Sequence, residues 1–176
     1  MEVVLAECSG LWRRTLLIQA DGTRVAGGDV RWLQGDSAYV DSRGFGGRLE
    51  QRDEVFEWHR MVDLEPPSST PDVGAMHWDG DILVETGVHA DYVEHWVRDD
   101  GPTSPRWALV LQSADGGAAQ LLRVGAAFGW ACTTAVTLAT VGGDEWEALA
   151  PSLFEGEVRV NDVRWKVVRS EGDVEL

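Results

Sequence analysis

The chain has 176 residues and a formal charge of -15 at pH 7, because 30 acidic residues outnumber 15 basic ones. The length suits one domain. With 44% hydrophobic residues, the chain can bury a sizeable core. A surface this negative repels phosphate backbones and anionic lipid. We therefore predict neither a nucleic-acid partner nor a membrane partner, and the sequence does not indicate an oligomeric state.

The compartment is inferred from the N-terminus and the cysteines. The first eight residues, MEVVLAEC, lack the basic start and the long apolar run of a signal peptide. No apolar run approaches the roughly 18 residues that a membrane-spanning helix needs. Cys8 and Cys132 lie far apart and in no CxxC spacing. We expect a cytoplasmic protein in which both thiols are free.

Strand and turn signals alternate along the whole chain. Asp-Gly pairs favour the positive φ of tight hairpin turns, and they occur at residues 21–22, 79–80, 100–101 and 115–116. Asn161-Asp162 is a similar signal, and the proline-rich stretch at 65–71 is predicted as a loop. The predicted strands are residues 11–19, 27–34, 37–43, 45–51, 55–64, 74–79, 81–87, 91–98, 106–114, 118–124, 127–136, 156–160 and 163–170.

One segment, residues 144–150, predicts a short helix near the C-terminus. Asp144 can cap it, and Glu147 three positions on completes a capping-box pattern. Pro151 disfavours helical backbone at the residue before it, so one or two turns are expected.

Many short strands, hairpin spacing and almost no helix indicate an all-β, antiparallel fold. We predict an up-and-down β-barrel of about 8–10 strands, because closing the sheet removes the exposed edges of a flat one. A single barrel domain is predicted across residues 1–176.

Four predicted strands carry a tryptophan and a hydrogen-bonding or charged residue two positions apart, which places both on one face of a strand. The pairs are Trp12 with Arg14, Trp32 with Gln34, Trp58 with Arg60, and Trp96 with Glu94. Apolar residues continue two of these faces, which we therefore predict to be inward. They are Leu16 and Ile18 after Arg14, and Phe56, Val62 and Leu64 around Trp58 and Arg60.

An aromatic wall with a few convergent polar groups is the usual lining of a small-molecule site, and an eight-stranded barrel can hold one small ligand. Arg14 and Arg60 outnumber Glu94, so the ligand is expected to be partly polar and to carry an anionic group such as a carboxylate. The alternative to a ligand site is that these pairs lie at the barrel mouth or form structural contacts. The predicted ligand-binding residues are Trp12, Arg14, Trp32, Gln34, Trp58, Arg60, Tyr92, Glu94 and Trp96.

Two other functions stay open beside non-covalent binding, which is the leading prediction. Glu85, Glu94 and Tyr92 could carry out general acid–base catalysis of isomerase or hydrolase type if burial separated their pKa values. A cavity that holds both carboxylates close together would favour this enzyme. The nine tryptophans could instead fill the interior and leave a structural barrel without a ligand.

Neither a metal nor a cofactor is predicted. The four histidines show no metal-binding spacing, and the chain contains no dinucleotide, phosphate-loop or nucleophile-elbow motif.

The motif Gly10-Leu11-Trp12, at the start of the first predicted strand, resembles the calycins, the grouping of lipocalins and fatty-acid-binding proteins. The resemblance implies a barrel in which this tryptophan closes one end against an arginine from late in the chain. Arg164 and Arg169 are candidates for that arginine.

A closer likeness is to a group of uncharacterised bacterial lipocalin-like proteins, which implies the same fold and supplies no activity. Haem barrels of the nitrobindin type use a histidine near the C-terminus, and this chain has none after His95. The similar stretches are Trp32-Leu33-Gln34, Gly44-Phe45-Gly46-Gly47, Trp58-His59-Arg60 through Asp63 to Pro66-Pro67, Asp72-Val73-Gly74, Val84-Glu85-Thr86-Gly87 and Tyr92-Val93-Glu94-His95-Trp96.

Overall fold

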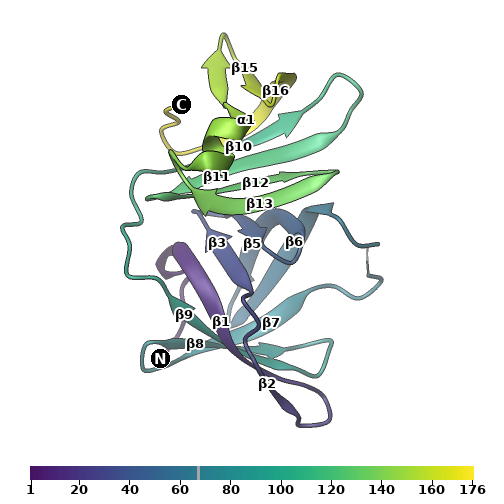
Figure 1. The fold of residues 1–176 in the computed structure, drawn as a ribbon. Helices are drawn as coiled ribbons and strands as arrows, with labels where there is room; N and C mark the ends of the chain where they lie inside the picture. The colour runs from purple at the N-terminus through teal and green to yellow at the C-terminus, as the bar shows by residue number, and fades with distance from the viewer. Residues whose placement is uncertain (67) are drawn as a thin grey trace.

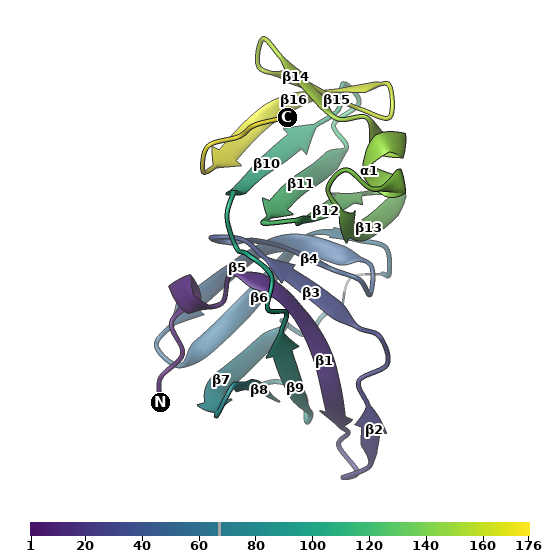
Figure 2. The ribbon, with the colours of Figure 1, turned by 60° about the vertical axis from the view of Figure 1, so that its left-hand side comes forward.

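The computed structural model describes residues 1–66 and 68–176 and contains two antiparallel sheets, one stacked on the other (Figures 1 and 2). Pro67, part of the predicted loop at 65–71, lies outside the described residues. The first sheet closes into a barrel, and the second, green to yellow in Figure 1, lies over one side of it. Within the described part of the chain, no helix has the length and apolarity needed to cross a membrane.

Eight strands form the barrel, and each pairs antiparallel with its neighbours. Pairing of the last strand with the first closes it, so the predicted antiparallel barrel is confirmed. A short strand, β2 (Arg24–Ala26), folds back on the end of β1. The barrel strands are β1 (Gly10–Ile18), β3 (Arg31–Gln34), β4 (Ala38–Asp41), β5 (Phe45–Arg52), β6 (Val55–Asp63), β7 (Val73–Asp79), β8 (Ile82–Gly87) and β9 (Val93–Arg98).

The later strands form the second sheet, which is open and has the order β13-β12-β11-β10-β16-β15-β14. The barrel thus occupies residues 10–98, and the single domain across 1–176 stays a prediction about how the two sheets fold together. The strands are β10 (Arg106–Gln112), β11 (Ala118–Val124), β12 (Ala127–Cys132), β13 (Ala135–Thr140), β14 (Ser152–Phe154), β15 (Glu157–Val160) and β16 (Val163–Glu171).

Most of the predicted turns lie where the sequence indicated. The Asp-Gly pairs at 21–22, 79–80 and 115–116 join paired strands, and each glycine has positive φ. Asn161 and Asp162 both have positive φ, 54° and 62°, as a two-residue hairpin turn requires. The pair at 100–101 is different, because it lies in the connection that leaves the barrel after β9 and reaches β10 in the second sheet.

Several local predictions were wrong. The strands β2 and β14 were not predicted, and residues 27–30, predicted as part of a strand, lie before β3. The strand predicted at 127–136 is two strands, β12 and β13, joined at Thr133-Thr134, a turn without the glycine, proline or asparagine that marks most turns. The helix α1 (Asp144–Leu149) forms as predicted, but Gly143 is its N-cap and no side chain caps it. Its acidic residues lie in the first turn, where they favour the helix dipole.

Two β-bulges change which side chains face the barrel interior. In β1 the pairing with β9 shifts between Arg14 and Leu16, and beyond the shift Leu17 lines the interior cavity. In β6 the pairing with β5 shifts after Arg60, and Val62 packs outside the barrel against the second sheet. The inward faces predicted through Ile18 and Leu64 are therefore wrong past each bulge, since one extra residue reverses the alternation.

The two sheets meet through an apolar interface on the outside of β3, β4 and β6. Gln120 crosses it, and its Nε2 donates hydrogen bonds to the carbonyl oxygens of Tyr39 at 2.8 Å and Gly47 at 3.1 Å. Because this interface covers their outer face, β3 and β4 are buried on both sides. The interface residues include Leu33, Ala38, Val40 and Val62 from the barrel and Ala108, Leu122, Val124 and Ala131 from the second sheet.

The N-terminal residues and α1 complete the two cores. Val3 and Cys8, on either side of a helical turn (η1, Leu5–Glu7), belong to the barrel core. On the far side of the second sheet, α1 contributes Trp146 and Leu149 to a separate apolar core. Both cysteines are free, as predicted.

Candidate functional site

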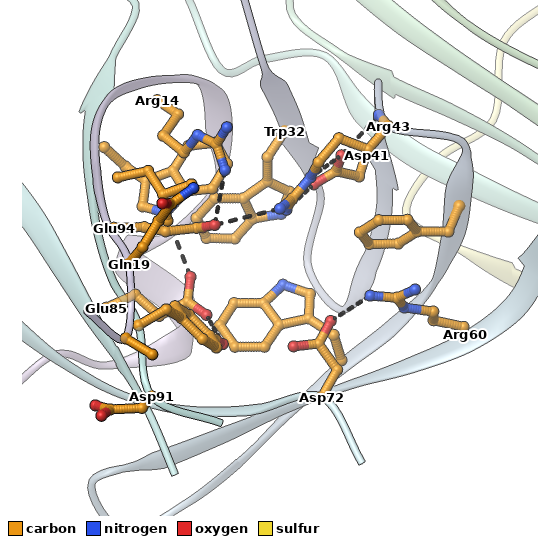
Figure 3. A pocket seen from close by; sticks show the side chains of 16 residues that line it. Arg14, Gln19, Trp32, Asp41, Arg43, Arg60, Asp72, Glu85, Asp91 and Glu94 are labelled. Atoms are coloured by element: carbon orange, nitrogen blue, oxygen red, sulfur yellow. Dashed lines mark hydrogen bonds and ion pairs between the residues drawn. The ribbon is translucent and has the colours of Figure 1, made fainter. Parts of the chain in front are cut away.

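The barrel interior contains a cavity of about 420 Å³ at one end (Figure 3). Its wall combines five aromatic side chains, three arginines and five carboxylates. The lining residues are Arg14, Leu17, Gln19, Ala20, Trp32, Asp41, Arg43, Phe45, Trp58, Arg60, Asp72, Glu85, Asp91, Tyr92, Glu94 and Trp96.

Seven of the nine predicted ligand-binding residues line this cavity. The two that do not, Trp12 and Gln34, are fully buried behind it. The seven are Arg14, Trp32, Trp58, Arg60, Tyr92, Glu94 and Trp96.

The end of the barrel behind Trp32 is packed shut by neutral hydrogen bonds. Trp12 stacks on Trp32, with ring centroids 5.6 Å apart, and its Nε1 donates to the carbonyl oxygen of Cys8 at 2.7 Å. Trp32 Nε1 donates to Gln34 Oε1 at 3.0 Å, and Gln34 Nε2 donates to the carbonyl oxygen of Gly35 at 3.3 Å. Each of these polar atoms has a hydrogen-bond partner within the chain, so Trp12 and Gln34 belong to the closed end of the barrel.

Arg98, from the last barrel strand, lies over the closed end. Its guanidinium is 5.0 Å from the centroid of the Trp12 ring. Gly10 has a φ of 142°, and a Cβ at that position would be 2.7 Å from Arg98 Cδ, so a larger residue would not fit. The partner of Trp12 is thus Arg98, and the candidates Arg164 and Arg169 were wrong because β16 belongs to the second sheet.

Two arginines meet one carboxylate in the cavity wall. Glu94 Oε1 accepts from Arg14 Nη1 at 2.9 Å and from Arg43 Nη1 at 3.2 Å. Arg43 also pairs with Asp41, at 2.8 Å between Nη2 and Oδ2. Arg14 Nε donates to the carbonyl oxygen of Gly27 at 3.1 Å. Arg14 points inward as predicted, and every one of these charges has an opposite charge in contact.

Arg60 occupies the mouth of the cavity. Its guanidinium lies 3.7 Å from the centroid of the Phe45 ring and pairs with Asp63 at 3.0 Å and Asp72 at 2.9 Å. A second hollow of about 590 Å³ adjoins the cavity here and shares Trp58, Arg60, Asp72 and Tyr92 with it. The Arg60–Asp72 ion pair therefore lies at the boundary between the two.

Glu85 is the buried acid of the site. It lies opposite Glu94 in the pairing of β8 with β9, and both side chains are 5% exposed. Tyr92 Oη donates to Glu85 Oε1 at 2.8 Å, and Trp96 Nε1 donates to Oε2 at 3.3 Å. Burial raises the pKa of Glu85 to about 8, and the negative charge of Glu94 adds to that effect. The site therefore favours the protonated form of Glu85.

The predicted ligand-binding set contains only three of the eight charged residues in the cavity wall: Arg14, Arg60 and Glu94. Glu85 was predicted only as a catalytic candidate, and Arg43, Asp41, Asp72 and Asp91 were not predicted. The inward position of Asp41 could have been predicted from the alternation of side chains along β4. The others had no usable signal, because loop residues such as Arg43 and Asp91 have no fixed alternation, and the apolar neighbours of Glu85 on β8 make both of its faces look buried.

These features define the class of protein: a closed eight-stranded antiparallel barrel that carries a second sheet and an internal cavity lined by aromatic rings and charged groups. No protein-family model and no curated protein matches the chain. Its fold is similar to the crystal structure of the uncharacterised protein YLR301w from Saccharomyces cerevisiae. The TM-score is 0.62 at 13% sequence identity, over 92% of this chain and 98% of that one. At this identity the likeness shows the fold alone.

Proposed function

We propose that this protein binds a small, partly polar ligand inside its barrel. The observation that carries the proposal is the cavity of about 420 Å³, whose size lies within the range of ligand sites. Its wall brings aromatic rings and charged groups together on a rigid, closed sheet. Such a wall can bury the apolar body of a ligand and orient its polar groups.

We also propose that the barrel is a calycin, related to the bacterial lipocalin-like group. The contact of Arg98 with Trp12 beside Gly10 supports this, since a tryptophan and an arginine close one barrel end as the resemblance implies, with the arginine here coming from the last barrel strand. The cytoplasmic location is proposed on the two free cysteines.

The balance of charges in the cavity indicates which kind of polar group the ligand carries. The positive charges of Arg14, Arg43 and Arg60 are each already paired with a carboxylate of the chain, and carboxyl groups outnumber arginines in the cavity wall. A ligand that donates hydrogen bonds fits this wall better than the carboxylate expected from the sequence.

Acid–base catalysis is the second candidate function, and one observation favours it. Glu85 and Glu94 are adjacent in the same cavity, and their surroundings differ: Glu94 contacts two arginines, while Glu85 is buried without a cation. Two carboxyl groups in such different environments can act as acid and base. Conversion of a bound compound, detected by mass spectrometry, would support this candidate over simple binding.

A purely structural role is the weakest of the three. It requires an interior filled by side chains, and the tryptophans fill only the end that contains Trp12.

A thermal-shift screen of a metabolite library tests the proposed function. A ligand at a hundredfold excess over its Kd contributes about 2.7 kcal/mol, which raises Tm by roughly 5–10 °C. Leu17→Trp fills the cavity and should abolish the shift, whereas Leu16→Trp, the neighbouring residue that does not line it, should retain the shift. If no compound raises Tm, or if Leu17→Trp responds like the parent, the proposal is wrong.

A further inference from the structure

The ion pairs of the cavity leave one buried carboxyl group unmatched. Glu94 contacts Arg14 and Arg43, Asp41 contacts Arg43, and Asp72 contacts Arg60. Glu85 makes no ion pair with any described residue, although its side chain is as buried as that of Glu94. A carboxylate buried without a counter-ion is unfavourable, so this position favours a positive charge from outside the chain.

The hydrogen bonds to Glu85 prepare it to accept rather than to donate. Tyr92 Oη and Trp96 Nε1 each donate to one of its two oxygens, at 2.8 Å and 3.3 Å. Figure 3 shows the Glu85 carboxyl group inside the cavity, with Asp91 below it in the same view. Asp91 is exposed and makes no ion pair within the described residues. A cation that enters the cavity therefore meets two unmatched acids.

The aromatic wall offers ring faces for the same charge. Arg43 lies over the rings of Phe45 and Trp96, and Arg60 lies over Phe45. Among the described residues, no guanidinium lies over the ring of Trp58 or of Tyr92, although both rings line the cavity. Cations bind aromatic faces within about 6 Å, and more strongly where water is excluded.

We propose that the cavity binds a small organic cation, a protonated amine on an apolar body, and that Glu85 is its counter-ion. The inference rests on the proposed binding function and names the class of ligand. The arginines would then hold Glu94, Asp41 and Asp72 in place, rather than contact an anionic ligand as the sequence suggested. Trp58 and Tyr92 would cover the apolar body and the charge.

This assignment predicts that binding releases a proton. Facing Glu85 are Glu94 on β9, Tyr92 before it, Asp72 before β7 and Arg43 after β4. Burial and Glu94 raise the pKa of Glu85 to about 8, so the free site carries a proton at pH 7. An incoming ammonium favours the ionised form, and the proton of Glu85 passes to solvent. Affinity for the amine therefore rises as pH increases from 6 to 9.

Isothermal titration with three matched probes tests the inference: phenethylamine, its neutral analogue phenethyl alcohol, and the anion hydrocinnamate. We expect phenethylamine to bind at least tenfold more tightly than either of the others. Glu85→Gln should weaken amine binding by roughly ten- to a hundredfold and change alcohol binding much less. Glu50→Gln, on the outside of the barrel, is the control and should bind like the parent.

Titration of the parent in buffers of different ionisation enthalpy adds a readout that needs no variant. We expect the release of roughly one proton per amine at pH 7. Equal affinity for the amine and the alcohol, or preference for hydrocinnamate, would overturn the inference and leave the proposed binding function standing. Failure of all three probes together with the metabolite library would overturn both.

Discussion

The two ends of the barrel contain similar residues in opposite arrangements. At the closed end, Trp12 and Gln34 are fully buried, and neutral hydrogen bonds to Cys8, Trp32 and Gly35 satisfy their polar atoms. At the open end, ionised groups surround a cavity, and the carboxylates outnumber the arginines. A tryptophan beside a polar group is thus a packing unit at one end and a cavity wall at the other. The difference depends on whether the polar group is satisfied within the chain.

The largest expected effect separates the two ends by stability. Trp12→Ala should lower the free energy of unfolding by about 3–5 kcal/mol, because it leaves a void among fully packed neighbours. Trp58→Ala should cost less, since that ring already faces a cavity and loses fewer contacts. Urea unfolding of both variants measures the difference. Equal losses would mean that the open end is packed as tightly as the closed one.

The next largest expected effect is a loss of stability when an ion pair at the open end is broken. Glu94→Gln removes the carboxylate that Arg14 and Arg43 share, and should destabilise the protein by roughly 1.5–3 kcal/mol. Asp36→Asn breaks the exposed pair with Arg106 and should cost less than about 1 kcal/mol. The comparison uses the same urea titration. A loss at Glu94 no greater than at Asp36 would mean that water, not the arginines, stabilises this charge.

The interface between the sheets tests whether the barrel and the second sheet unfold together. A Cβ on Gly129 would lie 2.8 Å from Val40 Cβ, so Gly129→Ala forces the sheets apart and should cost about 1–3 kcal/mol. Gly101→Ala, in the exposed connection, should change little. Tryptophan fluorescence and circular dichroism should give one coincident transition if residues 1–176 are a single domain. Two separate transitions would contradict that prediction.

The last effect is a pH dependence of stability. The folded-state pKa of Glu85 is raised to about 8, so folding favours the protonated form. The stabilisation is complete below the unfolded-state pKa, near 4.5, and is lost as pH rises through about 8. The parent should therefore lose stability relative to Glu85→Gln between pH 5 and 8. Parallel curves for the two proteins would show that Glu85 is ionised throughout this range.

Sequence reasoning recovered the barrel because alternation and turn residues are local signals. The pairs Asp79-Gly80 and Asn161-Asp162 marked their hairpins, and spacing by two placed Trp58, Arg60 and Glu94 in the interior. The division into a barrel and a second sheet carries no such signal. It depends on β9 closing on β1 rather than continuing to β10, which is a pairing between distant segments.

The parts of the site that the sequence could not predict have physical causes. Bulges after Arg14 and after Arg60 reverse the alternation, so Leu17 faces the cavity while Val62 faces the second sheet. The charge of the cavity depended on groups such as Arg43, which loops and turns bring together from distant parts of the chain. The sign of the net charge of the cavity could therefore not be predicted by counting charged residues along the strands.

An NMR titration of the indole N–H signals with phenethylamine tests the contrast between the two ends of the barrel most directly. Trp96 Nε1 donates to Glu85 in the cavity wall, whereas Trp12 Nε1 donates to Cys8 at the closed end. We expect a progressive shift of the Trp96 signal and no change in the Trp12 signal. Equal shifts of both signals, or no shift of Trp96 at high amine concentration, would contradict the claim that the open end binds an organic cation and the closed end is a structural core.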